Sequence, residues 1–126
     1  SRTAESLRPV ATVEDLSHMQ KLAEGIHLDG AVADYLIALV RGTRTHGSVL
    51  LGASPRAGVS LASAAKAYAF LQHRAYVLPD DIKAMAPLVL SHRLHLRSEA
   101  RMQGHTSAGV LQEVLGRLPV PVGLER

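Results

Sequence analysis

Hydrophobic residues recur every three or four positions along most of this chain, the spacing that places them on one face of an α-helix. The strongest pattern predicts a helix over residues 29–44. Its apolar positions fall at i, i+3, i+4, i+7 and i+8 and are Val32, Tyr35, Leu36, Leu39 and Val40. Helices with similar apolar faces are expected over residues 79–93 and 107–118.

An earlier helix is expected to begin after Thr12, which can cap it, and to end at about Glu24, before Gly25. Acidic residues in its opening turn suit the positive end of the helix dipole. We expect its buried stripe to consist of Val13, Leu16, Met19, Leu22 and Ala23.

A helix rich in alanine is expected from Pro55 to about His73. Ser54 is a natural N-cap, and Pro55 suits the first helical position because its missing N–H has no partner to lose there. Alanine side chains are small and let neighbouring helices approach closely. We therefore expect this helix at the centre of a bundle.

The remaining segments are shorter. Residues 48–51 and 94–97 can form short extended connectors, and residues 98–106 are polar and are expected to form a loop. Pro87 is expected to kink or split the helix that begins at Pro79. The predicted fold is all-α: a small bundle of four to five helices with short strand-like connectors.

Composition narrows the classes of function. The chain has 126 residues, 47% of them hydrophobic, which suits one domain with a real core. It has no cysteine, so disulfides and thiolate zinc sites are excluded; this is compatible with a cytoplasmic location, which we expect. No apolar run approaches the length of a membrane span, and the first residues lack the apolar stretch of a signal peptide.

Histidine is the other candidate metal ligand, and the chain has seven. None pair at i, i+4, the spacing that puts two imidazoles on one helical face. We expect no metal site and assign the histidines to the surface.

One segment carries a chemical signal, because Arg56 falls in the first turn of the alanine-rich helix. A cation there opposes the helix dipole and costs about 0.3–1 kcal/mol. This cost would be offset if a phosphate bound there, held by the Arg56 guanidinium and by first-turn N–H groups. Gly52 and Gly58 would permit the close approach. Alternatively, Arg56 lies in solvent or pairs with a carboxylate.

The segment Gly52-Ala53-Ser54-Pro55-Arg56-Ala57 resembles the GASPRA segment of MoxR-type AAA+ ATPases, which opens a helix of the lid domain with the sensor-2 arginine. The resemblance covers nearly the whole chain, in order and with similar spacing. Its other landmarks are Leu7–Val10, Asp34–Ile37, Leu39–Arg44, Tyr76–Lys83, Val89–Leu94 and Leu118–Pro121.

This resemblance implies the lid of an ATPase that assembles as a ring, usually a hexamer, with chaperone-like activity and often a partner containing a von Willebrand factor A domain. It implies that Arg56 contacts the phosphates of ATP and couples hydrolysis to lid movement. It also implies that Ala53, Ser54 and Pro55 line the nucleotide cleft. Residues 1–11 would lead in from the AAA+ core, residues 12–118 would form the lid, and residues 119–126 would form a tail.

The sequence departs from the family where a threonine is usual and Leu78 stands, which removes a hydroxyl N-cap at a cost of about 1 kcal/mol. It also has no phosphate-binding G-x-x-x-x-G-K-[ST] loop. ATP and Mg²⁺ are therefore expected to bind the full-length protein, and this segment alone is expected to be inactive and to bind neither tightly.

Two alternatives belong to other classes. Arg93, Arg97 and Arg101 form a loose basic strip that could contact nucleic acid, although the net charge is only +3 and no aromatic residues alternate with the arginines. We consider nucleic acid the weaker reading. A helical adaptor that binds proteins through an apolar groove is the other alternative.

Overall fold

The computed structural model describes residues 13–122, apart from five side chains of the first helix: Val13, Asp15, Leu16, Met19 and Gln20. The elements follow the order α2 (Val13–Glu24), α3 (Gly30–Thr45), β1 (Val49–Leu51), α4 (Pro55–Leu71), α5 (Pro79–Leu90), the 3₁₀ turn η1 (Ser91–Arg93), β2 (His95–Leu96), α6 (Ser98–Met102) and α7 (Ser107–Arg117). The fold is mostly helical, as predicted. No helix within residues 13–122 is both long and apolar enough to cross a bilayer.

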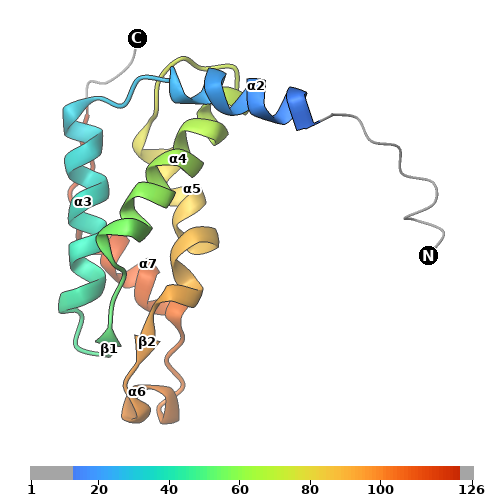
Figure 1. Ribbon diagram of the computed structural model, residues 1–126. Coiled ribbons are helices and arrows are strands. Elements are labelled where there is room, and N and C mark those ends of the chain that lie inside the picture. Colours follow the sequence, from blue (N-terminus) through green and yellow to red (C-terminus); the bar gives the residue numbers. More distant parts are fainter. Residues whose placement is uncertain (1–12, 123–126) are drawn as a thin grey trace.

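Helices α3, α4 and α5 lie side by side, with α7 behind them (Figure 1). Helix α2 lies across one end of this bundle, and the ribbon of β1 and β2 lies at the other end together with α6. The predicted face of α3 is confirmed, because all five of its apolar positions are buried. Asp29 caps α3 by accepting a hydrogen bond from the Ala31 N–H, 3.0 Å away.

Helix α4 occupies the centre, as its alanine content predicts. It packs against α2, α3 and α5. Ala57, Ala65 and Ala69 are completely buried at these contacts, where larger side chains would push the helices apart. The bundle is therefore held together by close approach of helix backbones to α4 as well as by leucine and valine packing.

Pro87 does not split α5, contrary to one of the two predicted outcomes. The helix is continuous from Pro79 to Leu90 and only then tightens into η1. Ile82, Ala86 and Leu90 are completely buried on one side of it. Their packing holds the helix through the position where the proline removes one backbone hydrogen bond.

The start of α5 replaces its missing hydroxyl cap by another means. Leu78 offers no side-chain hydrogen bond, and the Asp81 carboxylate instead accepts from the Leu78 N–H at 2.7 Å. Asp81 is 1% exposed and also takes both ends of the Arg74 guanidinium. Hydrogen bonding to Asp81 is the main reason why the pKa of Arg74 lies above its ordinary value. The loop between α4 and α5 is thus fixed by a partly buried ion pair.

Three predictions about the periphery need correction or stay open. Residues 98–102 form the short helix α6 and not a loop; its one buried residue, Ala100, gives no periodic pattern to detect. Leu22 is 45% exposed although it was expected in a buried stripe, because α2 lies across the end of the bundle and covers it with one side only. The cap at Thr12 and the segments 1–11 and 123–126 lie outside the described residues.

The connectors tie both ends of the bundle. As expected for short extended segments, β1 and β2 pair antiparallel, with Val49 opposite Leu96. At the far end, His27 and Tyr76 form an isolated parallel bridge. The His27 N–H donates to the Ala75 carbonyl at 2.8 Å, and the Val77 N–H donates to the His27 carbonyl at 2.9 Å. The α2–α3 and α4–α5 connections are therefore held to each other.

Two helices end in the same hydrogen-bonded motif with different residues at its left-handed position. After α4, His73 has φ +60°, and the Arg74 N–H donates to the Ala69 carbonyl at 3.0 Å. After α6, Gly104 has φ +91°, and the His105 N–H donates to the Ala100 carbonyl at 3.0 Å. Glycine is usual in this motif because a Cβ is strained there.

We expect His73→Gly to raise the free energy of unfolding by about 0.5–1 kcal/mol. The relief of left-handed strain, about 1–2 kcal/mol, exceeds the extra chain entropy of glycine, about 0.4–1 kcal/mol. Gly104→Ala should lower the free energy of unfolding for the opposite reason. Urea titration followed by circular dichroism measures both. A lower urea midpoint for His73→Gly would contradict this explanation.

A second prediction concerns Tyr35, whose side chain is 4% exposed and whose hydroxyl makes no hydrogen bond within residues 13–122. Burial raises the pKa of this phenol, and the charge of Asp80 raises it further. Tyr35→Phe removes an unpaired polar group and should raise the free energy of unfolding by up to about 1 kcal/mol. The control is Tyr68→Phe, at a partly exposed ring, which should change it little. Thermal unfolding compares the two, and destabilisation by Tyr35→Phe alone would argue that the hydroxyl is paired in solution.

Candidate functional site

The candidate site is the turn between β1 and α4, which carries Ala53, Ser54, Pro55 and Arg56. The end of α3 holds this turn through both polar backbone groups of Ala53. The Ala53 N–H donates to Thr43 Oγ1 at 3.0 Å, and the Ala53 carbonyl accepts from Arg44 Nε at 2.8 Å. We call these two hydrogen bonds the Ala53 clamp. Ala53 itself is completely buried, so it shapes the turn and presents no exposed atoms to a ligand.

Thr43 is fixed in the orientation that the clamp requires. Its side chain is completely buried, and its hydroxyl donates to the Val40 carbonyl at 2.6 Å. Because the hydroxyl proton is used within α3, its lone pairs face the Ala53 N–H. The threonine thus satisfies a buried backbone donor that would otherwise be costly to leave unpaired.

Gly52 serves packing against α3, and the predicted role of Gly52 and Gly58 in admitting a phosphate stays a prediction. A Cβ on Gly52 would lie 2.7 Å from the Cα of Arg44 and 2.8 Å from its nitrogen, a clash with backbone that cannot give way. Gly58 is buried and faces Val40 and Leu36, where a Cβ would make ordinary contacts at 3.5 and 3.8 Å. Gly52 is therefore the glycine that the contact between the turn and α3 requires.

Ser54 and Pro55 begin α4 as predicted. Ser54 Oγ accepts from the Ala57 N–H at 3.2 Å, and Pro55 occupies the first turn. Proline has no N–H, and the Gly58 N–H is used by the Ser54 carbonyl at 3.3 Å. The backbone N–H groups of Ser54, at the cap, and of Arg56 are therefore the donors left open at this end of α4 within the described chain. The convergence of amides and guanidinium on a phosphate stays a prediction, with these two amides available to it.

Arg56 is exposed, and its guanidinium makes no hydrogen bond or ion pair with any side chain or backbone group that the structure describes. The first turn of α4 contains no acidic residue to offset its charge. The alternative in which a carboxylate pairs with Arg56 is therefore not found in this part of the chain. A cation at the positive end of a helix dipole has no local compensation here.

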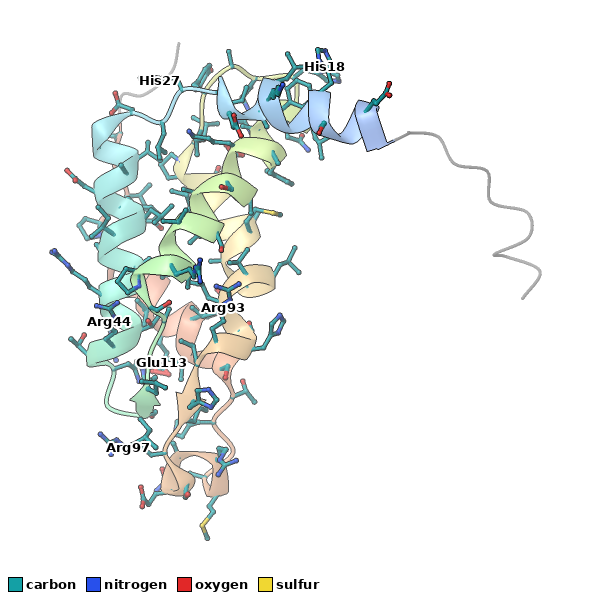
Figure 2. All side chains as sticks on the ribbon, viewed as in Figure 1. His18, His27, Arg44, Arg93, Arg97 and Glu113 are labelled. Carbon is teal, nitrogen blue, oxygen red and sulfur yellow. The ribbon has the colours of Figure 1, made fainter. Side chains whose placement is uncertain are left out.

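A groove of about 420 Å³ runs beside the turn, between α3 and α4. Its walls are mainly apolar, and Ile37 and Val59 are 45% and 68% exposed there. Arg41, Arg44 and Pro55 also line it. Figure 2 shows Arg44 near the end of α3 that faces the start of α4. The surroundings of the turn are therefore cationic.

The other sequence candidates do not converge on a site. Arg93, Arg97 and Arg101 are exposed, but Arg93 and Arg97 lie well apart on the surface (Figure 2). Within residues 13–122, no three histidine or acidic side chains gather as metal ligands would. His46 is not a surface histidine as predicted: its side chain is 7% exposed, accepts from the Ser48 N–H at 3.0 Å and contacts Glu113 of α7 at 3.3 Å.

Comparison with known proteins identifies the family. Residues 41–114 match the family model of the AAA lid domain. The chain is an AAA lid domain of the MoxR family. It is 40% identical to the protein YeaC of Bacillus subtilis over 97% of this chain, and 30% identical to chaperone MoxR1 of Mycobacterium tuberculosis over 94% of it. A crystal structure of a candidate ATPase from Cytophaga hutchinsonii superimposes with a TM-score of 0.82, at 30% identity over 86% of this chain.

This lid domain spans 38% of YeaC, 34% of MoxR1 and 36% of the Cytophaga hutchinsonii protein. The other two thirds of those relatives therefore have no counterpart in the 126 residues. Membership of an AAA family implies an AAA core elsewhere in the same polypeptide.

Thr43 and Arg44 were not predicted to belong to the site, because nothing in their local spacing shows that they reach a residue ten and nine positions further on.

We expect Thr43→Val to lower the free energy of unfolding of the lid domain by about 1–3 kcal/mol, because the buried Ala53 N–H loses its acceptor. Thr43→Ser keeps the acceptor and should cost less, although it loses a methyl group. Chemical denaturation of the three proteins provides the measurement. Equal losses for both variants would show that packing of the methyl group, and not the hydrogen bond, stabilises the turn.

Proposed function

We propose that this lid domain belongs to a MoxR-type AAA+ ATPase and supplies the sensor-2 arginine, Arg56. In this proposal ATP and Mg²⁺ bind between the AAA+ core and the lid, and Arg56 contacts the terminal phosphates. Loss of those contacts on hydrolysis changes the position of the lid relative to the core. The segment alone has no phosphate-binding loop, so hydrolysis requires the full-length protein.

The observation that supports this proposal is an exposed guanidinium on the first turn of a helix that is fixed to the bundle. Within residues 13–122 Arg56 has no carboxylate partner, and its charge is unfavourable at that end of α4. A phosphate would remove this penalty and offer paired acceptors to the planar guanidinium. The Ala53 clamp fixes the backbone three residues before Arg56. The charge is therefore presented outward from a rigid position.

Several properties of the proposed protein rest on the family rather than on the geometry of the lid. We propose a chaperone-like ring, six-membered as is usual in the family, in the cytoplasm. Neighbouring subunits and a partner with a von Willebrand factor A domain are the proposed interaction partners. A relative, MoxR1 of Mycobacterium tuberculosis, is named as a chaperone, which agrees with this assignment.

In the full-length ATPase we expect Arg56→Ala to reduce kcat by about 10²–10³-fold, the usual loss when one charged contact to a transition state is removed. Arg56→Lys should recover only part of the rate, because an ammonium group cannot bind two phosphate oxygens in the fork geometry of arginine. Steady-state phosphate release at saturating ATP measures both variants.

Arg117→Ala is the matched control, since Arg117 is a 70% exposed arginine at the end of α7 with only a surface contact to Glu113. Its turnover should equal that of the unmodified protein. Normal turnover in Arg56→Ala would remove Arg56 from the mechanism and with it the proposed sensor-2 role.

A further inference from the structure

We propose that Thr43 and Arg44 are positioning residues for Arg56, so that the end of α3 sets where the phosphate-contacting arginine points. This inference rests on the proposed role of Arg56 and extends it to two residues that touch no nucleotide themselves. They act through the Ala53 clamp, which joins the end of α3 to the start of α4. The link is short, because only three residues separate Leu51 of β1 from Pro55 of α4.

The clamp leaves the turn little freedom to move. It fixes the Ala53 N–H and the Ala53 carbonyl from two successive residues of one helix. Gly52 lies so close to the backbone of Thr43 and Arg44 that even a methyl group would not fit. Immediately afterwards Ser54 caps α4 through the Ala57 N–H. The direction of the first turn of α4 is therefore determined by α3.

The position of Arg44 is not explained by helix stability alone. A cation in the last turn of α3 is favourable to the dipole wherever its side chain points. The Arg44 side chain is exposed, yet its Nε is committed to the Ala53 carbonyl at 2.8 Å in another segment. Holding a long side chain in one conformation costs conformational entropy. The hydrogen bond adds rigidity at the residue three positions before Arg56.

Loss of the clamp should reduce turnover through Arg56. A displacement of about 1 Å in a group that contacts the reacting atoms can lower a rate by up to about 10²-fold. We therefore expect Arg44→Ala and Thr43→Val each to lower kcat of the full-length ATPase by about 10- to 100-fold. Thr43→Ser retains the hydroxyl acceptor and should restore most of the rate.

A double-mutant cycle separates positioning from general structural damage. Arg44→Ala and Thr43→Val are measured in the unmodified protein and again in the Arg56→Ala background. If the clamp acts through Arg56, each substitution lowers kcat in the first background and has almost no further effect in the second. General damage to the fold would lower kcat by the same factor in both. All kcat values are measured well below the unfolding temperature of the least stable variant, so that every variant is fully folded during the assay.

The matched controls are Thr45→Val and Arg117→Ala. Thr45 lies in the same helix, and its hydroxyl bonds only within α3. Arg117 is an exposed arginine at the end of α7 with only a surface contact to Glu113. Both variants should leave kcat nearly unchanged.

Two results would overturn the inference: equal losses in both backgrounds, or normal kcat for Arg44→Ala and Thr43→Val in the unmodified protein. Failure of the proposed function gives a different result: kcat of Arg56→Ala is then normal, and both the proposed function and this inference are overturned. If kcat of Arg56→Ala is low but Arg44→Ala and Thr43→Val have normal kcat, only this inference is overturned.

Discussion

Two hydrogen bonds to the peptide groups of one alanine connect the end of α3 to the start of α4. They satisfy a buried donor and an acceptor in a turn too short to satisfy them itself. Together with the close contact of Gly52 on the α3 backbone, they fix the start of the alanine-rich α4 against α3. The rest of the bundle is arranged around α4, which contacts α2, α3 and α5. The position of Arg56 is a consequence of this arrangement.

The parts of the fold that could be predicted are those in which one residue type repeats at a helical period. The stripe that begins at Val32 and the alanines of α4 encode their burial directly in their spacing. Elements that depend on a single contact could not be predicted. Helix α6 has one buried residue, Ala100, and the continuity of α5 past Pro87 depends on neighbours that are distant in sequence. Leu22 was misplaced because an amphipathic pattern does not show how much of a helix face its neighbours cover.

The local structure of the candidate turn was predicted, and its role at a nucleotide stays a prediction. Ser54 as N-cap, Pro55 in the first turn and an exposed Arg56 follow from local rules of helix initiation. The glycines were assigned to a ligand because their contact with α3 brings together residues eight or more positions apart, which local spacing does not reveal. The number of open amides at the start of α4 is limited by two local features, since the serine cap uses the Ala57 N–H and the proline has none. The contribution of Thr43 and Arg44 is evident only from the structure, which shows their hydrogen bonds to Ala53 in the turn.

The bridge between His27 and Tyr76 has a mechanical consequence. This bridge and the β1–β2 ribbon join the connecting segments by backbone hydrogen bonds at both ends of the bundle, so that α3, α4 and α5 resist sliding past one another. Helix α4 has 17 residues, a rod of about 25 Å at 1.5 Å per residue. Because these helices are held together, a rotation of about 10° about the first turn of α4 would carry the far end of the bundle through about 4 Å, taking the length of α4 as the radius. In the function proposed above, a small shift at Arg56 would therefore become a displacement of a few ångströms at the other end of the lid.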